Sequence, residues 1–288
     1  MVSPYTLYEA DLHCHTTASD GLLTPTELVR LVAELGLKGV AITDHDTIQG
    51  WDEAEDVGSN YQIQILKGIE LNTNWHGEEV HILGYELDGS SSYLKGKLGG
   101  LREAREQRMF NILDRLATLG IDISEDEVRQ FAQGESIGRP HIAQVLLNRG
   151  FVRSIKEGFE RYIGRGAPAY VPRYKLTPEE GIELVRKAQG VAVLAHPGIG
   201  RLEEGIPAWI EAGLQGIEVQ HSEHKPEDVL RYSTLAEQYN LLATGGSDFH
   251  GEARKPGVEV GRWGVSLNVV EQIFSLAKQN RLSMIRES

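Results

Sequence analysis

The stretch that decides the fold is residues 10–21, ADLHCHTTASDG, near the start of the chain. Apolar side chains alternate with polar ones up to this point, which predicts a β-strand from Tyr5 to His13. Because side chains alternate along a strand, His13 and His15 share one face while Cys14 points to the other. Two imidazoles on one face can hold a single metal ion, so this strand end is a candidate metal site.

The rest of the chain alternates short apolar runs with helical patterns, which favours a largely parallel sheet. Capping-box patterns at residues 24–27 and 177–180 each open a predicted helix. Further strands are predicted at 39–43, 62–66, 80–85, 191–195, 216–220 and 241–244. Seven strands with helices between most of them predict an α/β fold, a distorted (β/α)7 barrel, with an open doubly wound sheet as the alternative.

Residues 99–165 break this alternation with helical patterns and no strand signal. The segment is periodic and not low in complexity, so we expect an all-helical insertion rather than a linker. The predicted organisation is therefore a barrel domain made of residues 1–98 and 166–288, interrupted by a helical insertion at 99–165 that acts as a substrate cap.

Composition excludes several functional classes. The net charge is 29 − 42 = −13, which disfavours duplex nucleic acid but allows a small anion or a single strand end as partner. Apolar runs are too short to cross a membrane, so no membrane partner is expected. The single cysteine allows no internal disulfide and, with no leader pattern, predicts a cytoplasmic protein.

Candidate metal ligands lie at the predicted strand ends all along the chain. Because the carboxyl ends of barrel strands converge on one mouth, residues far apart in sequence can meet there. Core histidines placed at random would not favour strand ends in this way. The candidates are Asp20, His45, Glu70, His81, His196, Asp248 and His250, in addition to His13 and His15.

Together these motifs resemble the PHP (polymerase and histidinol phosphatase) family. The pattern is Asp-x-His-x-His with Ser-Asp-Gly, then Ile-Thr-Asp-His-Asp, Gly-x-Glu, His, Ala-His-Pro and Ser-Asp-x-His, from residue 5 to about residue 250. Gly138-Arg139-Pro140-His141-Ile142-Ala143 resembles a subgroup of stand-alone 3′,5′-nucleotide bisphosphate phosphatases, which includes a 5′→3′ exoribonuclease.

The resemblance implies a site for two to three divalent ions, Mn, Fe or Zn, and three sets of ligands. The first set is His13, His15, Glu70 and Asp248; the second is Asp20, His45 and His250; the third is Glu70, His81 and His196. Asp20 stands where some members have His, which favours Mn²⁺ or Fe²⁺ slightly. The implied activity is phosphate ester hydrolysis by metal-activated hydroxide, with Glu70, His196 and Asp248 as catalytic residues.

Four further residues are candidates for substrate binding. Arg139 and His141 flank Pro140 at a predicted helix start, where they form either a phosphate clamp or a solvated helix end. His221 and His224 follow the strand at 216–220, so one of them can face the mouth of the barrel or both can lie in a surface loop.

The predicted substrate is a small anionic phosphate ester, above all the 3′-phosphate of a nucleoside 3′,5′-bisphosphate, with short 5′-phosphorylated RNA as a further one. Two alternatives stay open. One is a phosphatase for a small metabolite such as histidinol phosphate, and the other is a metal-stabilised regulatory module without turnover.

Overall fold

The computed structural model describes residues 8–131, 138–172, 174–200 and 202–287. The chain forms two compact units, one of Met1–Lys97 with Leu176–Ser288 and one of Leu98–Lys175. The second unit therefore continues past residue 165, where the sequence analysis ended the insertion. No described helix has the length and apolar character needed to cross a membrane.

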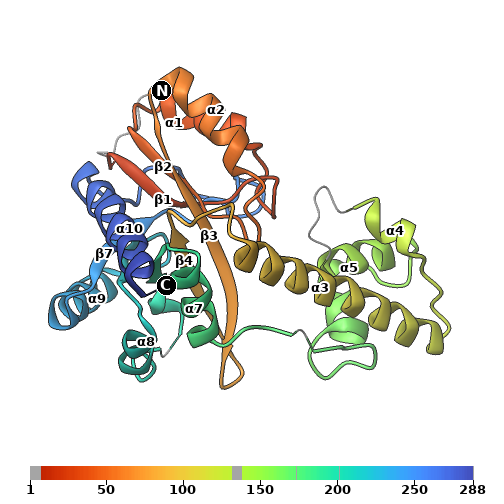
Figure 1. Cartoon of the computed structure of the whole chain (residues 1–288). Coiled ribbons are helices and arrows are strands. Elements are labelled where there is room, and N and C mark those ends of the chain that lie inside the picture. Colours follow the sequence, from red (N-terminus) through yellow and green to blue (C-terminus); the bar gives the residue numbers. More distant parts are fainter. Residues whose placement is uncertain (1–7, 132–137, 173, 201, 288) are drawn as a thin grey trace. The chain divides into compact units, whose positions relative to one another are not determined.

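The first unit contains one sheet of seven strands in the order β1 to β7 (Figure 1). The strands are β1 Ala10–Cys14, β2 Gly39–Ile42, β3 Gln64–Trp75, β4 Glu78–Tyr85, β5 Val191–Leu194, β6 Gly216–His221 and β7 Leu242–Gly246. Bridges from Cys14 to Phe249 and from Ala10 to Val265 bring the two edges together. The predicted distorted (β/α)7 barrel is confirmed, and the open-sheet alternative is wrong.

Two strands differ from their predicted bounds by more than two residues. The first begins at Ala10 rather than Tyr5, and residues 5–7 lie outside the described part of the chain. The third begins at Gln64, because Gln62 ends the preceding helix with a left-handed φ of 56°, and it continues to Trp75. The extension was missed because a lysine and a glycine follow Leu66 and interrupt the apolar run, although the apolar–polar alternation resumes from Ile69.

The strand β4 runs antiparallel to both of its neighbours, β3 and β5, while the remaining pairs are parallel. A two-residue turn joins β3 to β4, and both of its residues, His76 and Gly77, have positive φ. Such turns match the twist of a hairpin. The reversal explains why His81 reaches the centre from the middle of β4, opposite Asn72, rather than from a strand end.

Helices surround the strands of this unit (Figure 1). They are α1 Pro25–Glu34, α2 Trp51–Tyr61, α7 Pro178–Lys187, the short η2 Pro197–Ile199, α8 Ile206–Ala212, α9 Pro226–Tyr239 and α10 Leu267–Glu287. Both predicted capping boxes form, Thr24 with Glu27 and Thr177 with Glu180. A buried cluster that includes Leu12 of β1 and Ile273 of α10 packs this last helix against the strands.

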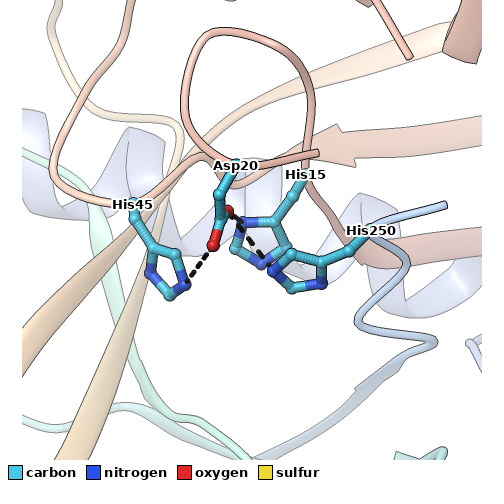
Figure 2. A group of neighbouring side chains, drawn as sticks. All are labelled: His15, Asp20, His45 and His250. Atoms are coloured by element: carbon cyan, nitrogen blue, oxygen red, sulfur yellow. Dashed lines mark ion pairs between the residues drawn. The ribbon is translucent and has the colours of Figure 1, made fainter. Parts of the chain in front are cut away.

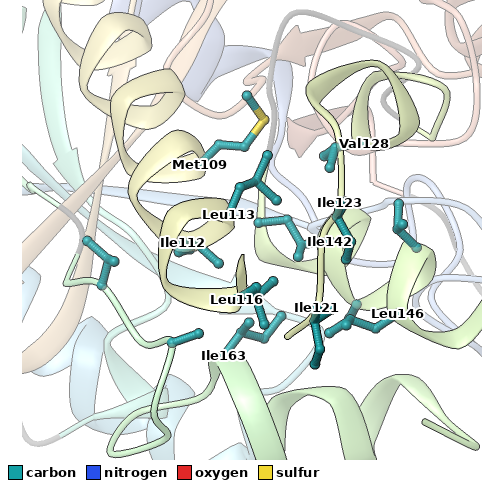
Figure 3. Packing of buried hydrophobic residues seen from close by; sticks show 14 of the residues in the cluster. Met109, Ile112, Leu113, Leu116, Ile121, Ile123, Val128, Ile142, Leu146 and Ile163 are labelled. Carbon is teal, nitrogen blue, oxygen red and sulfur yellow. The ribbon is translucent and has the colours of Figure 1, made fainter. Parts of the chain in front are cut away.

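The second unit holds most of α3 Ser92–Thr118, with α4 Glu125–Arg129, α5 Arg139–Asn148, α6 Ile155–Gly158 and the π-helical turn η1 Phe159–Ile163. The described residues of this unit form helices and loops and no named strand. Its core is its own (Figure 3): Leu116 of α3, Ile142 and Leu146 of α5 and Ile163 of η1 are buried together.

Barrel closure leaves no space beside Gly246, where a methyl group would overlap the backbone and Cβ of His13. We expect Gly246→Ala to destabilise the protein by at least about 1–3 kcal/mol, the cost of overpacking a tight core. Gly96→Ala is the matched control, because its methyl group meets nothing within 4 Å, and in a helix it should stabilise by roughly 0.5–1 kcal/mol. Urea unfolding of both variants measures the difference, and equal stabilities would contradict the tight closure.

Candidate metal centre

The nine predicted ligands come together at the end of the barrel where β1, β2 and β5 finish. His13 is in β1, Glu70 in β3 and His81 in β4. The remaining ligands lie in the connections that follow strands: His15 and Asp20 after β1, His45 after β2, His196 after β5, and Asp248 and His250 after β7. The barrel thus gathers side chains that the sequence spreads from residue 13 to residue 250.

Glu70 lies at the middle of the cluster and is buried. Its Oε1 is 2.7 Å from Nδ1 of His81 and 3.0 Å from Nε2 of His196. Its Oε2 is 3.0 Å from Nδ1 of His45, 3.2 Å from Nε2 of His15 and 3.4 Å from Nε2 of His13. One carboxylate therefore faces five imidazoles, which is the arrangement expected of a bridging ligand.

A second group forms around Asp20, as Figure 2 shows. One Asp20 oxygen is 3.4 Å from Nε2 of His250 and 3.7 Å from Nδ1 of His15, while the other is 4.0 Å from Nε2 of His45. The potential ligand atoms of these four residues all lie within 4.8 Å of one another. This is the predicted second set with His15 added, so His15 stands between two groups.

Asp248 divides its two oxygens between two environments. Its Oδ1 faces the metal cluster, 3.2 Å from Nε2 of His15 and 3.5 Å from Nε2 of His13. Its Oδ2 accepts a hydrogen bond of 2.6 Å from Nζ of Lys255 and lies 3.5 Å from Nε2 of His221. Lys255 was missed by the sequence analysis, because a lysine in a glycine- and proline-containing loop carries no motif of its own.

Buried polar side chains behind the ligands fix the connecting loops. Asp44 accepts hydrogen bonds from the backbone and hydroxyl of Thr16 and from the hydroxyl of Ser19, which closes the loop that carries Asp20. Asp46 accepts from the side-chain amide of Asn72, whose nitrogen lies 3.2 Å from Nδ1 of His45. These hydrogen bonds orient two of the predicted ligands, Asp20 and His45.

Three residues of the centre have positive φ: Asp46 at 53°, His196 at 27° and Asp248 at 57°. Side chains other than glycine rarely adopt this region, and each such residue costs of order 1–3 kcal/mol. Backbone strain collects at functional sites, where the surrounding structure enforces it.

The electrostatics of the centre couple its acids and bases. Burial acts to raise the pKa of Glu70, but the imidazoles of His81, His45 and His13 outweigh it and hold this pKa well below its ordinary value. Burial acts to lower the pKa of His81, but Glu70 and Glu79 raise it to about 10. Without a metal ion, His81 therefore binds a proton that offsets part of the negative charge of the buried carboxylates.

The polar atoms at the middle of the cluster fit divalent cations. Several are buried and lack a hydrogen-bond partner in the described structure: Nε2 of His13, both ring nitrogens of His15 and Oε2 of Glu70. Unpaired buried polar atoms are costly, and these converge on the same space. Imidazole and carboxylate donors suit Mn, Fe and Zn, and the described centre contains no thiolate ligand.

The structure separates the two histidines at the end of β6: His221 is the last residue of the strand, and His224 lies in the loop after it. His221 is buried, and its Nε2 faces Asp248. His224 instead has Nδ1 2.8 Å from the carbonyl oxygen of Val219, while its Nε2 accepts the N–H of Gly198. His221 is therefore the one that joins the cluster.

Arg139 and His141 belong to the second compact unit. Arg139 donates to the carbonyl oxygen of Ile163 at 3.2 Å, and its guanidinium lies over the rings of Phe159 and Tyr170. Nδ1 of His141 accepts the N–H of Gly138 at the start of α5. Both side chains thus have structural contacts inside their own unit.

Comparison with known proteins gives a consistent result. Residues 11–164 match the PHP domain. The chain is 34% identical to the 5′-3′ exoribonuclease Rnm of Escherichia coli over 284 residues, 96% of both chains, and 35% identical to a 3′,5′-nucleoside bisphosphate phosphatase of Chromobacterium violaceum over 246 residues, 83% of this chain and 86% of that one. A crystal structure described as a candidate metal-dependent phosphoesterase of Bifidobacterium adolescentis has a TM-score of 0.79 at 34% identity, covering 93% of this chain and 96% of that one.

The pKa shifts make the metal-free protein sensitive to alkali. The pKa values of His13 and His81 lie above the ordinary 6.5, so their protonation stabilises the folded protein fully below about pH 6.5 and less as the pH rises. For His81 this stabilisation is lost as the pH passes about 10. Because the pKa of Glu70 is lowered, its ionised carboxylate stabilises the folded protein at every pH above its ordinary pKa of 4.5. We expect the Tm of chelator-treated protein to fall over this alkaline range.

Divalent cations bind neutral imidazole, so they should raise the Tm most where the protons have been lost. Thermal unfolding from pH 6.5 upward, with and without Mn²⁺, measures both effects. A metal-free Tm that does not change with pH would contradict the coupling.

Proposed function

The chain belongs to the PHP domain family, and on that premise we propose that it removes the 3′-phosphate from nucleoside 3′,5′-bisphosphates and trims short 5′-phosphorylated RNA. Enzymes with these two activities are named among relatives that share about a third of its residues. The observation that carries the proposal is the carboxylate of Glu70 facing five imidazoles, because these six side chains are most of the nine predicted metal ligands.

Two to three divalent ions would be held by the three predicted ligand sets, with Glu70 shared between two of them. The first set lies within mutual ligand distance as a group, and the second does so with His15 added. In the third, His81 and His196 share Oε1 of Glu70. The number of ions and their identity as Mn, Fe or Zn belong to this proposal.

Bound ions would supply positive charge against the phosphoryl oxygens and activation of the attacking water. In the reaction, the water oxygen bonds to phosphorus, the ester P–O bond breaks and the released 3′-oxygen takes up a proton. Glu70, Asp248 and His196 are the residues proposed to act closest to the phosphorus. Lys255 keeps Oδ2 of Asp248 engaged, which leaves Oδ1 to face the cluster.

The second compact unit is proposed as the substrate cap. A substrate with two phosphates offers a second anion, and the guanidinium of Arg139 has five N–H donors, of which one bonds Ile163. The guanidinium lies over two rings, and its remaining donors would form a planar fork suited to phosphate oxygens.

A phosphate-release screen in Mn²⁺ tests the function. We expect release from adenosine 3′,5′-bisphosphate to exceed release from AMP and from histidinol phosphate, and 5′-phosphorylated oligonucleotides to be shortened from the 5′ end. Glu70→Gln should lose both bound metal and turnover, because it removes half of the carboxylate that faces five imidazoles.

Each alternative has its own outcome in this screen. Preference for histidinol phosphate would favour the small-metabolite phosphatase. Full metal content with no release from any ester would favour the regulatory module.

Arg139→Ala tests the cap. A hydrogen bond to a charged group contributes about 1.5–3 kcal/mol, so kcat/KM should fall roughly 10- to 150-fold on the bisphosphate. The loss should be much smaller on p-nitrophenyl phosphate, which has no second phosphate. Metal content should not change.

The control is Arg161→Ala, an exposed arginine of the same unit that pairs with Glu157 and should leave both substrates unaffected. Because Arg139 also bonds Ile163, the Tm of each variant is measured alongside. Equal losses on both substrates would exclude a role in gripping the second phosphate.

A further inference from the structure

Glu218 is a fully buried acid in the strand β6 that the sequence analysis did not select. It lies between an apolar isoleucine and an apolar valine, and no motif marks it. Its carboxylate contacts two of the predicted metal ligands at once. Oε1 is 3.1 Å from Nδ1 of His13, and Oε2 accepts the backbone N–H of His196 at 2.8 Å.

The two histidines face Glu70 on their other side. Nε2 of His13 is 3.4 Å from Oε2 of Glu70, and Nε2 of His196 is 3.0 Å from Oε1. Their rings are stacked 5.7 Å apart with an interplanar angle of 18°. Glu218 therefore contacts the ring of His13 and the backbone of His196, while Glu70 lies against the Nε2 atoms of both rings.

The contact with Glu218 determines which nitrogen of His13 carries the proton. An ionised carboxylate can only accept hydrogen bonds, so the proton must be on Nδ1. The lone pair of a neutral His13 is then on Nε2, the buried nitrogen that has no hydrogen-bond partner. That is the form of imidazole that binds a metal ion.

The contact with His196 acts on the backbone. This residue has φ 27° and ψ 56°, a strained conformation at the point where the chain leaves β5. The hydrogen bond from its N–H to Glu218 holds the conformation that directs the ring toward Glu70.

Glu218, His13 and His221 also satisfy the distances of a separate metal group. Their hydrogen bonds argue against that role. Both oxygens of Glu218 are engaged, and Nδ1 of His221 accepts the N–H of Glu223 at 3.2 Å, which places the proton of a neutral His221 on Nε2. In this group, Nδ1 of His13 and Nε2 of a neutral His221 both carry protons, so Glu218 is left as the group that accepts hydrogen bonds behind the centre.

We propose that Glu218 is a positioning residue that fixes the proton of His13 on Nδ1 and the backbone of His196 together, so that both rings offer Nε2 to cations held around Glu70. The inference rests on the proposed metal centre. It adds a group that touches neither metal nor substrate.

The test is Glu218→Gln, with metal affinity as the readout. The amide replaces one oxygen by a donor, so either His13 is forced to carry its proton on Nε2 or two N–H groups oppose each other at His196. Loss of such a partner lowers metal affinity by about 10- to 100-fold. Competition with a fluorescent chelator for Mn²⁺ and Zn²⁺ measures this without any substrate.

Glu179→Gln is the matched control. It makes the same change in an acid that accepts a hydrogen bond from Nε1 of Trp209, away from the cluster, and metal affinity should stay at the wild-type value. Wild-type affinity in Glu218→Gln would overturn the proposal.

A measurement on the wild-type protein covers the case in which Glu218→Gln does not fold. In zinc-loaded protein with ¹⁵N-labelled histidine, the NMR signal of His13 should show its proton on Nδ1, with the assignment taken from His13→Gln. A proton on Nε2 would overturn the proposal. A wild-type protein that binds metal normally but releases no phosphate would instead reject the proposed function and leave this inference standing.

Discussion

Burying the carboxylate of Glu70 requires positive charge around it, because an unpaired buried ion costs several kcal/mol. The barrel surrounds the carboxylate with five imidazoles, which can hold protons or divalent cations beside it. They come from β1, from the connections after β1, β2 and β5, and from the reversed strand β4. Most of the other features of the centre serve to place these rings. Hydrogen bonds to Asp44 hold the loop that follows β1, and the Asp46–Asn72 pair lies beside His45. The strained backbone of His196 directs the ring of that residue toward Glu70.

This arrangement gives the centre two ways to balance its charge. Protons on the imidazoles and divalent cations between them compete for the same lone pairs. The surface carries a net charge of −13, so long-range attraction cannot account for holding an anionic substrate. Positive charge must therefore be local, from bound cations and from a few side chains such as Lys255, which lies against Asp248.

Much of this could be predicted from the sequence, for identifiable physical reasons. Strand ends, capping boxes and the ligands in short motifs are local patterns, and all seven strands were found. The reversal of β4 was not predicted, because the alternation within a strand shows which face is buried but not whether the neighbouring strand runs parallel or antiparallel. Glu218 and Lys255 were missed because their roles arise from partners distant in sequence, 205 residues away in the case of Glu218 and His13.

The two-residue turn at His76 and Gly77 also bears on how such a chain can diversify. Asn72 pairs with His81 across an antiparallel ribbon whose tip lies beyond them. A single inserted residue between either one and the body of the barrel would shift the pairing and turn every following side chain to the opposite face. Residues added in pairs at the tip would lengthen the ribbon and leave that pairing intact. Insertions at the hairpin tip can therefore enlarge the surface of the protein during evolution without displacing the predicted metal ligands.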